Sequence, residues 1–250
     1  APAHGASPVM THRSPALADQ VLSRLRTITG SIPTVTAEQL AWERAKACEP
    51  IAVTRAGILQ VIHADGSATV ERVFEGCRQT GPGPCVVRMR DRPGAHGAPR
   101  PVVSVDAPGA EVVSADAPGG WIAHEVTFPN GTPKEFSILV RREIPGAYSL
   151  EPTEAREGWL DYRTIWAAEA LSIEVRMPAG PRWVDFAGWS VWLGTRWDEP
   201  GQAVPGAVAA ACRKAAWSSG ADWSRIQIDG ATPGFCWRLR WVMDRMGDGA

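Results

Sequence analysis

Lysine is nearly absent from this chain of 250 residues. Only Lys46, Lys134 and Lys214 are lysines among 26 basic residues, so arginine supplies almost all of the positive charge. An arginine excess beside abundant alanine, glycine, proline and valine is typical of proteins from GC-rich bacterial genomes. It also supplies planar guanidinium groups suited to recognition. The composition therefore predicts a bacterial protein and leaves both explanations of the arginine excess open.

The sequence also lacks a strong net charge and long apolar runs. A formal net charge of −1 disfavours nucleic acid and anionic lipid as general partners, because both require a summed basic field. No run of about 18 apolar residues could cross a membrane, and residues 1–20 lack the charged-then-apolar order of a signal peptide. Five cysteines, an odd number, fit a reducing compartment. We expect a cytoplasmic protein with no membrane segment.

Motifs that would name a mechanism are missing as well. The chain contains no Walker loop, no G-x-G-x-x-G fingerprint, no G-x-S-x-G elbow and no H-E-x-x-H zinc motif. Cys77 and Cys85 flank a turn-rich loop and could meet as a disulfide, but their spacing fits neither a zinc hook nor a redox pair. The sequence therefore predicts no metal and no cofactor. An enzyme of an unusual kind stays open.

The first fifty residues carry helical signals. Residues 1–12 are small, polar and unpatterned, which predicts a disordered start. Residues 13–50 predict two helices, one from Ser14 to Gly30 and one from Thr36 to Cys48. Two such helices are compatible with a helix-turn-helix, although the second has a mixed rather than a basic face. We interpret them as helices that pack on a following sheet.

From residue 51 onward the pattern is that of β-strands. Asp65-Gly66 between two alternating runs predicts one hairpin, and Asn130-Gly131 between residues 121–128 and 134–144 predicts another. One short helix is expected at 205–217. Other strands are expected at residues 85–89, 160–166, 171–177, 182–193, 224–228 and 235–243, with two short edge strands in the turn-rich stretch before residue 120. Residues 51–250 are therefore predicted to form one mainly β domain, an antiparallel β-sandwich or barrel.

Tryptophan is concentrated in the last third of the chain. Eight of the 12 tryptophans lie between Trp183 and Trp241, more than one layer of a sandwich core requires. Because tryptophan and arginine are common in ligand pockets and at protein interfaces, some of these residues are expected to line a binding surface. A thick aromatic core is the alternative. The predicted binding residues are Trp183, Trp189, Trp192, Trp237, Trp241, Arg182, Arg238 and Arg240.

An enzymatic alternative rests on four candidate residues. A histidine side chain is suited to proton transfer, and a carboxylate that orients His124 would have to come from another strand, because its neighbour Glu125 points to the opposite face. Asp161, Tyr162 and Asp185 lie near aromatic residues, where desolvation can raise the pKa of an acid. A structural role is the alternative for each of the four.

Three segments of the chain resemble a known family. They are Phe136-Ser-Ile-Leu-Val-Arg-Arg, Leu171-Ser-Ile-Glu-Val-Arg-Met-Pro, and the strand Phe235-Cys-Trp-Arg-Leu-Arg-Trp that follows Thr232-Pro233-Gly234. Over residues 130–245 they resemble the C-terminal all-β domain of actinobacterial helix-turn-helix-type regulatory proteins. The resemblance implies an all-β domain in a regulatory protein. It supplies no ligand-binding or catalytic residue.

The leading hypothesis is a non-catalytic cytoplasmic sensing or interaction module. Its Trp/Arg-rich face would bind an apolar or aromatic small molecule or a protein partner. The alternative is a cofactor-independent enzyme, cyclase- or hydrolase-like, that acts on a bulky apolar substrate in an aromatic cavity. The sequence sets no oligomeric state.

Overall fold

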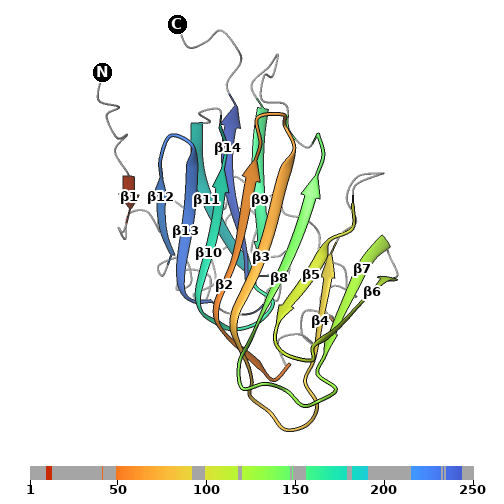
Figure 1. Cartoon of the computed structure of the whole chain (residues 1–250). Helices are drawn as coiled ribbons and strands as arrows, with labels where there is room; N and C mark the ends of the chain where they lie inside the picture. The colour runs from red at the N-terminus through yellow and green to blue at the C-terminus, as the bar shows by residue number, and fades with distance from the viewer. Residues whose placement is uncertain are drawn as a thin grey trace, which may run out of the picture.

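The computed structural model describes residues 49–91, 99–117, 120–146, 148, 156–178, 182–190, 215–231, 233 and 235–243, together with Met10–His12 and Ala41. Almost all of these residues lie in β-strands or in the turns between them (Figure 1). The prediction of a mainly β protein is therefore confirmed. Of the two expected N-terminal helices, the structure describes only Ala41, which is helical. Residues 205–214 of the short helix expected at 205–217 lie outside the described residues.

The largest element is an eight-stranded sheet. Neighbouring strands are antiparallel, with the single exception of β10 and β2, which are parallel. The predicted antiparallel architecture is therefore wrong at that pair. The strand order is β1 (Met10–His12), β12 (Ala215–Ser219), β13 (Trp223–Ala231), β10 (Ala168–Arg176), β2 (Ile51–Ile62), β3 (Ala68–Gln79), β8 (Phe136–Ile144) and β5 (Val102–Asp106).

Two antiparallel three-stranded sheets accompany the large one. The first has the order β11 (Arg182–Ser190), β14 (Phe235–Met243) and β9 (Arg156–Arg163), and the second has the order β4 (Val86–Asp91), β7 (Trp121–Thr127) and β6 (Glu111–Ala117). Each of the three sheets ends in edge strands among the described residues, so none closes into a barrel.

All three sheets contribute to one hydrophobic core. The alternation of the sequence explains this arrangement, because every second residue of a strand points to the same face. In β2, for example, Ala56, Ile58 and Ile62 are buried while the residues between them are more exposed, apart from Gln60. The small sheets contribute Val87, Met89, Val126, Leu160, Leu239 and others to the same core.

The first predicted hairpin is confirmed. β2 and β3 form an antiparallel pair in which Ile62 is opposite Ala68 next to the turn, and the turn contains Asp65 and Gly66. Gly66 has a φ of 78°, a conformation that L side chains rarely adopt, and the Asp65 carboxylate accepts a hydrogen bond from the Ser67 amide at 2.9 Å. Local chemistry therefore favours this connection, and the Tyr148 amide adds a hydrogen bond to the Gly66 carbonyl oxygen at 2.9 Å.

The second predicted hairpin is wrong. A turn does form near Asn130-Gly131, with the Gly131 amide 3.0 Å from the Phe128 carbonyl oxygen. The flanking strands diverge, however, since β7 pairs with β4 and β6 whereas β8 pairs with β3 and β5. Pro129 and Pro133 lack the amide hydrogens that a continuing ladder would need, so this segment carries the chain between two sheets.

Other expectations are corrected at the ends of the large sheet. Met10–His12, expected in an irregular start, form β1 and pair with β12. Ala215–Trp217, expected at the end of a helix, belong to β12. The two short strands expected before residue 120 are β5 and β6, and both are edge strands. Cys77 and Cys85 are both buried free thiols, so the disulfide between them does not form.

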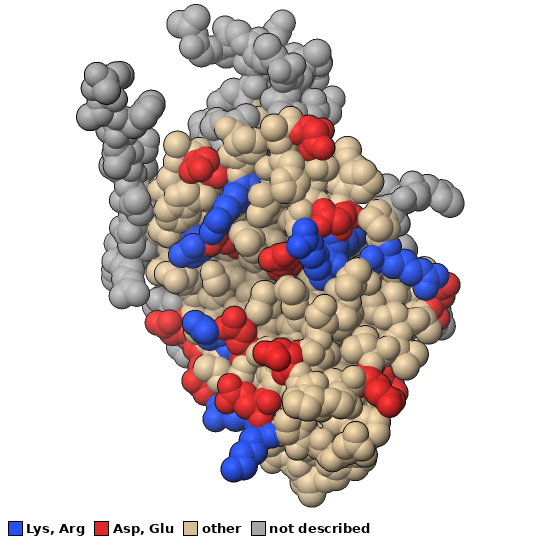
Figure 2. All heavy atoms as spheres, in the orientation of Figure 1, with Lys and Arg blue, Asp and Glu red and all other residues tan. Residues whose placement is uncertain are grey.

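Charged side chains of both signs lie next to one another on the face of the molecule seen in Figure 2. The Arg55–Glu75 ion pair joins the neighbouring strands β2 and β3, and the Arg78–Glu169 pair joins β3 to β10 across β2. Exposed pairs of this kind contribute little to stability.

Candidate functional site

The predicted binding residues of β14 divide between the two faces of its sheet. Trp237 and Trp241 point into the core, and each is only 1% exposed. The Trp241 ring contacts Tyr148, with 6.1 Å between ring centroids, and Trp237 stacks on Phe235 at 6.4 Å. These two rings therefore belong to the interior packing and do not line an open surface.

Gly158 explains how β9 accommodates the indole of Trp241. The two residues are directly opposite in the β14–β9 register. A Cβ atom at position 158 would stand 2.4 Å from the indole ring, closer than any real contact. Only glycine allows the ring to approach the neighbouring backbone this closely.

The opposite face of the same two strands carries a tryptophan and two arginines. Trp159 is 52% exposed, and the Arg238 guanidinium lies over its ring at 5.3 Å from the centroid. Arg240 is directly opposite Trp159 in the register. Arg238 lies on this outward face but is only 5% exposed. We call Trp159, Arg238 and Arg240 the Trp159 face.

The remaining predicted binding residues, and the catalytic candidates Asp161 and Asp185, can be placed only by backbone register or not at all. On β11, Arg182 is opposite Val242, Trp183 is opposite Trp241, Asp185 is opposite Arg240 and Trp189 is opposite Cys236. Asp161 on β9 is opposite Arg238. The side chains of these five residues, and Trp192 altogether, lie outside the part of the chain that the structure describes.

His124 lies at the centre of a second polar cluster, between the β4–β7–β6 sheet and the eight-stranded sheet. On β7 it is directly opposite Met89 of β4 and Ser114 of β6. The Ser114 hydroxyl is 2.8 Å from His124 Nδ1, and Asp91 Oδ2 of β4 is 3.4 Å from His124 Nε2. The carboxylate near His124 thus comes from another strand, as predicted from the opposite directions of His124 and Glu125 on β7. The His124 side chain is fully buried.

Arginines of the large sheet hold Asp91 from the other side. Arg72 of β3 donates a hydrogen bond to Asp91 Oδ2, and both side chains are largely buried. Burial alone would raise the pKa of Asp91, but the contact with His124 and the charges of Arg72 and Arg142 outweigh it and lower that pKa. Asp91 is therefore a carboxylate near neutral pH. We call Arg72, Asp91, Ser114, His124 and Arg142 the His124 cluster.

Tyr162 lies in the same interior. It is buried and directly opposite Trp237 in the β14–β9 register, and the charge of Arg72 acts on its hydroxyl. Burial strongly raises the pKa of Tyr162, so it stays a neutral phenol. Among the described residues the Tyr162 hydroxyl, Trp237 Nε1 and Arg142 Nε make no hydrogen bond. Of the four catalytic candidates, Tyr162 feels the charge of Arg72 directly, and His124 is connected to Arg72 through Asp91.

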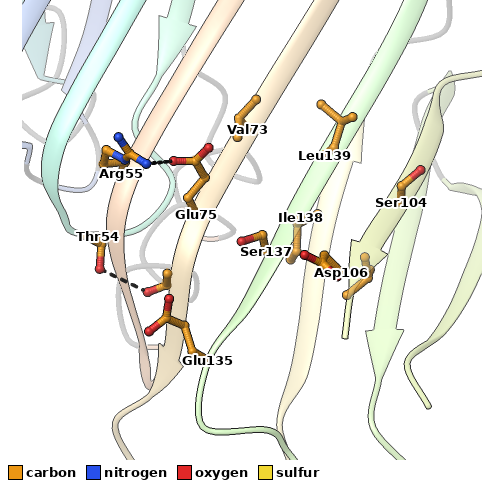
Figure 3. A pocket seen from close by; sticks show the side chains of 12 residues that line it. Thr54, Arg55, Val73, Glu75, Ser104, Asp106, Glu135, Ser137, Ile138 and Leu139 are labelled. Carbon is orange, nitrogen blue, oxygen red and sulfur yellow. Dashed lines mark hydrogen bonds and ion pairs between the residues drawn. The ribbon is translucent and has the colours of Figure 1, made fainter. Parts of the chain in front are cut away.

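A groove of about 670 Å³ lies across β2, β3, β8 and β5, on the face of the large sheet that points away from Arg72 and the core (Figure 3). It is at the point where the register of β3 against β8 shifts between Phe74 and Cys77. Arg55 and Glu75 pair at its rim, 2.7 Å apart, and Glu135 and Asp106 add two further carboxylates. Sequence reasoning did not predict this groove, because an irregular register leaves no signal in residue alternation.

Ser114, Asp91 and Arg72 were also missed. They lie on three strands and are separated by 19 and more residues, so no local motif connects them. The only sequence signal was the requirement that a partner for His124 come from another strand. No group of three or more His, Cys, Asp or Glu residues in the described part of the chain could hold a metal ion. No helix within that part is long and apolar enough to span a membrane.

No family model matches this chain, and no curated protein does. Among the solved structures that match is one described as "a putative protease from Parabacteroides distasonis". It is 11% identical, with a TM-score of 0.39, over 77% of this chain and 40% of the other. The chain therefore spans well under half the length of that protein. A likeness at this level supports no conclusion about activity.

Proposed function

We propose that this protein is a recognition module that binds a protein partner through the Trp159 face. The observation that carries the proposal is the pair formed by Trp159 and Arg238, in which an exposed indole lies against a nearly buried guanidinium. Tryptophan and arginine are the residues most enriched at energetic hot spots of protein interfaces. In this proposal the module has the sensing or interaction role that the sequence predicts.

The pair is suited to binding because it is already ordered. Arg238 is nearly buried and lies against the Trp159 ring, so association does not have to immobilise a freely moving side chain. Half of a tryptophan side chain is about 100 Å² of mainly apolar surface, and covering it is worth about 2–3 kcal/mol. Cation–π contact with Arg238 adds strength once water is excluded.

A protein fits this face better than a small molecule. Small-molecule sites are concave and enclose most of their ligand, whereas Trp159 stands on the face of a three-stranded sheet. The enclosed rings of Trp237 and Trp241 are unsuited to a ligand, because reaching them would require opening the core. A macromolecular surface can cover Trp159 without any such change.

Site-directed photo-crosslinking tests the proposal. A photoreactive phenylalanine derivative is placed at position 159, and in a matched control at Val102, which is 62% exposed on the distant edge strand β5. One protein should be captured from position 159 and not from position 102. That protein, purified, should bind the chain, and Trp159→Ala should weaken binding by about 30-fold or more. Equal capture at both positions, or unchanged affinity of the variant, would contradict the proposal.

A further inference from the structure

We propose that Ser114 is a nucleophile, that His124 accepts its proton, and that the site cleaves carboxylic esters with an apolar acyl group. The proposal concerns the His124 cluster and is independent of the Trp159 face. It rests on a chain of contacts across three antiparallel strands: Ser114 Oγ is 2.8 Å from His124 Nδ1, and Asp91 Oδ2 is 3.4 Å from His124 Nε2. An alcohol, an imidazole and a carboxylate in this order are the groups that activate a catalytic serine, here with the roles of the two ring nitrogens exchanged relative to the common Ser-His-Asp triad.

The surroundings of the imidazole determine where its proton lies. Asp91 is ionised, because Arg72 and Arg142 stabilise its negative charge. Asp91 is the only carboxylate that the described part of the chain places within 4 Å of His124 Nε2, and the tautomer that fits this contact has its N–H on Nε2. Nδ1 is then a free acceptor, and Ser114 donates its hydroxyl hydrogen to it.

The contact between Asp91 and His124 is long in the free protein. At 3.4 Å it exceeds an ordinary hydrogen bond, and Nε2 makes no well-aligned bond to another described residue. Catalytic hydrogen bonds are often loose before substrate binds and shorten during the reaction. Asp91 is therefore a positioning residue, since it acts on the substrate only through His124.

The location of the three residues combines an accessible nucleophile with a protected base. Ser114 is exposed on the edge strand β6, whereas the His124 side chain is fully buried behind it. A substrate can thus reach Ser114 from the sheet edge while water has little access to His124. Val112, two residues before Ser114 on the same face of β6, is 38% exposed and offers an apolar contact for an acyl chain.

The reaction balances with water as the second reactant. Ser114 Oγ bonds to the ester carbonyl carbon while its proton moves to His124 Nδ1, and the π electrons of the carbonyl move to its oxygen. When the carbonyl re-forms, the bond to the leaving alcohol breaks and that alcohol takes the proton from Nδ1. Water then attacks the acyl-serine with the same proton transfers, releasing the carboxylic acid and restoring Ser114.

Covalent labelling of the whole chain tests this activity. A fluorophosphonate probe should label one serine, identified as Ser114 by peptide mass spectrometry, and p-nitrophenyl butyrate should be hydrolysed. Ser114→Ala should abolish both reactions. Ser104→Ala is the matched control on the edge strand β5, where no histidine lies opposite in the register, and it should change neither. His124→Gln should slow labelling by at least about 100-fold.

A second measurement keeps the test decisive if His124→Gln unfolds the chain. Ser114→Cys and Ser104→Cys each introduce an exposed thiol, and their alkylation by iodoacetamide is compared on protein shown to be folded by circular dichroism. The thiol at position 114 should react at least about 10-fold faster, and Asp91→Asn should reduce this ratio. Equal alkylation rates together with no fluorophosphonate labelling at Ser114 would overturn the proposal and make the contact between Ser114 and His124 purely structural.

Discussion

Gly158 lies directly beneath the indole of Trp241, in a position that no other residue could occupy without moving that ring. The indole is buried between sheets and has no room to retreat. This contact couples β9 to β14 at the centre of a three-stranded sheet.

Gly158→Ala should therefore destabilise the protein through overpacking, by about 2–3 kcal/mol. Urea denaturation followed by circular dichroism measures the change in the free energy of unfolding. A double-mutant cycle isolates its cause: in a Trp241→Ala background, which itself costs about 3–5 kcal/mol, Gly158→Ala should cost less than about 1 kcal/mol. Equal costs in both backgrounds would show that the indole is not responsible.

Asp91 should make stability depend on pH in the acid range. Its pKa is lowered in the folded protein, so its contribution is fully present above the unfolded value of about 3.9 and is lost as the pH falls through the folded value. Asp91→Asn should cost about 3 kcal/mol at neutral pH because Arg72 is left without its partner. The variant should also lose less stability than the parent protein as the pH falls from about 5 through the unfolded pKa and on to the lower folded pKa of Asp91. Asp229→Asn, an exposed position of β13, is the control and should leave the pH profile unchanged.

Glu174 should contribute more to stability than an exposed glutamate of the same strand. It is buried on β10, and its carboxylate accepts hydrogen bonds at 2.6 Å from Nε of Arg176 and from Nε of Arg225. Glu174→Gln should lower the free energy of unfolding by about 2–3 kcal/mol. Glu169→Gln, which breaks the exposed pair with Arg78, should cost less than about 1 kcal/mol. Thermal and urea unfolding of the two variants make the comparison, and equal costs would contradict it.

Cys77 should be chemically inert in the folded protein. Burial raises its pKa to about 12, and the pKa of Cys85 is raised by burial as well. At pH 8 the thiolate fraction of Cys77 falls on the order of 1000-fold, and its burial blocks reagents further. Iodoacetamide labelling with peptide mass spectrometry should detect neither thiol in native protein and both in guanidinium chloride. Rapid native labelling of Cys77 would show that this part of the core opens readily.

Elements specified by neighbouring residues were predictable from the sequence, and elements specified by distant ones were not. The hairpin at Asp65-Gly66 is encoded by its own turn and by the alternation on either side. The alternation of β14 likewise identified Trp237 and Trp241 as residues of one face. It could not show that Arg238 on the other face is only 5% exposed, since burial of an outward side chain depends on contacts from other parts of the fold.

The same distinction applies to the candidate sites. His124 could be singled out from the sequence, and so could its need for a carboxylate on another strand. Asp91 and Ser114 could not be named, because only the register of β4 and β6 against β7 selects them. Trp159 was missed because a single tryptophan between glycine and leucine carries no sign of its exposure.

The parallel contact between β2 and β10 determines when this fold can be completed. The strands on one side of that contact in the large sheet, β3, β8 and β5, all precede residue 145, whereas β10 and β13 are synthesised later. More than a hundred residues separate Ile58 from its partner Ile173. Closing so long a loop delays the pairing of β2 with β10, which joins the two halves of the large sheet, so we expect slow folding. On the ribosome, β2 should present an unpaired edge to other nascent chains until β10 has been synthesised.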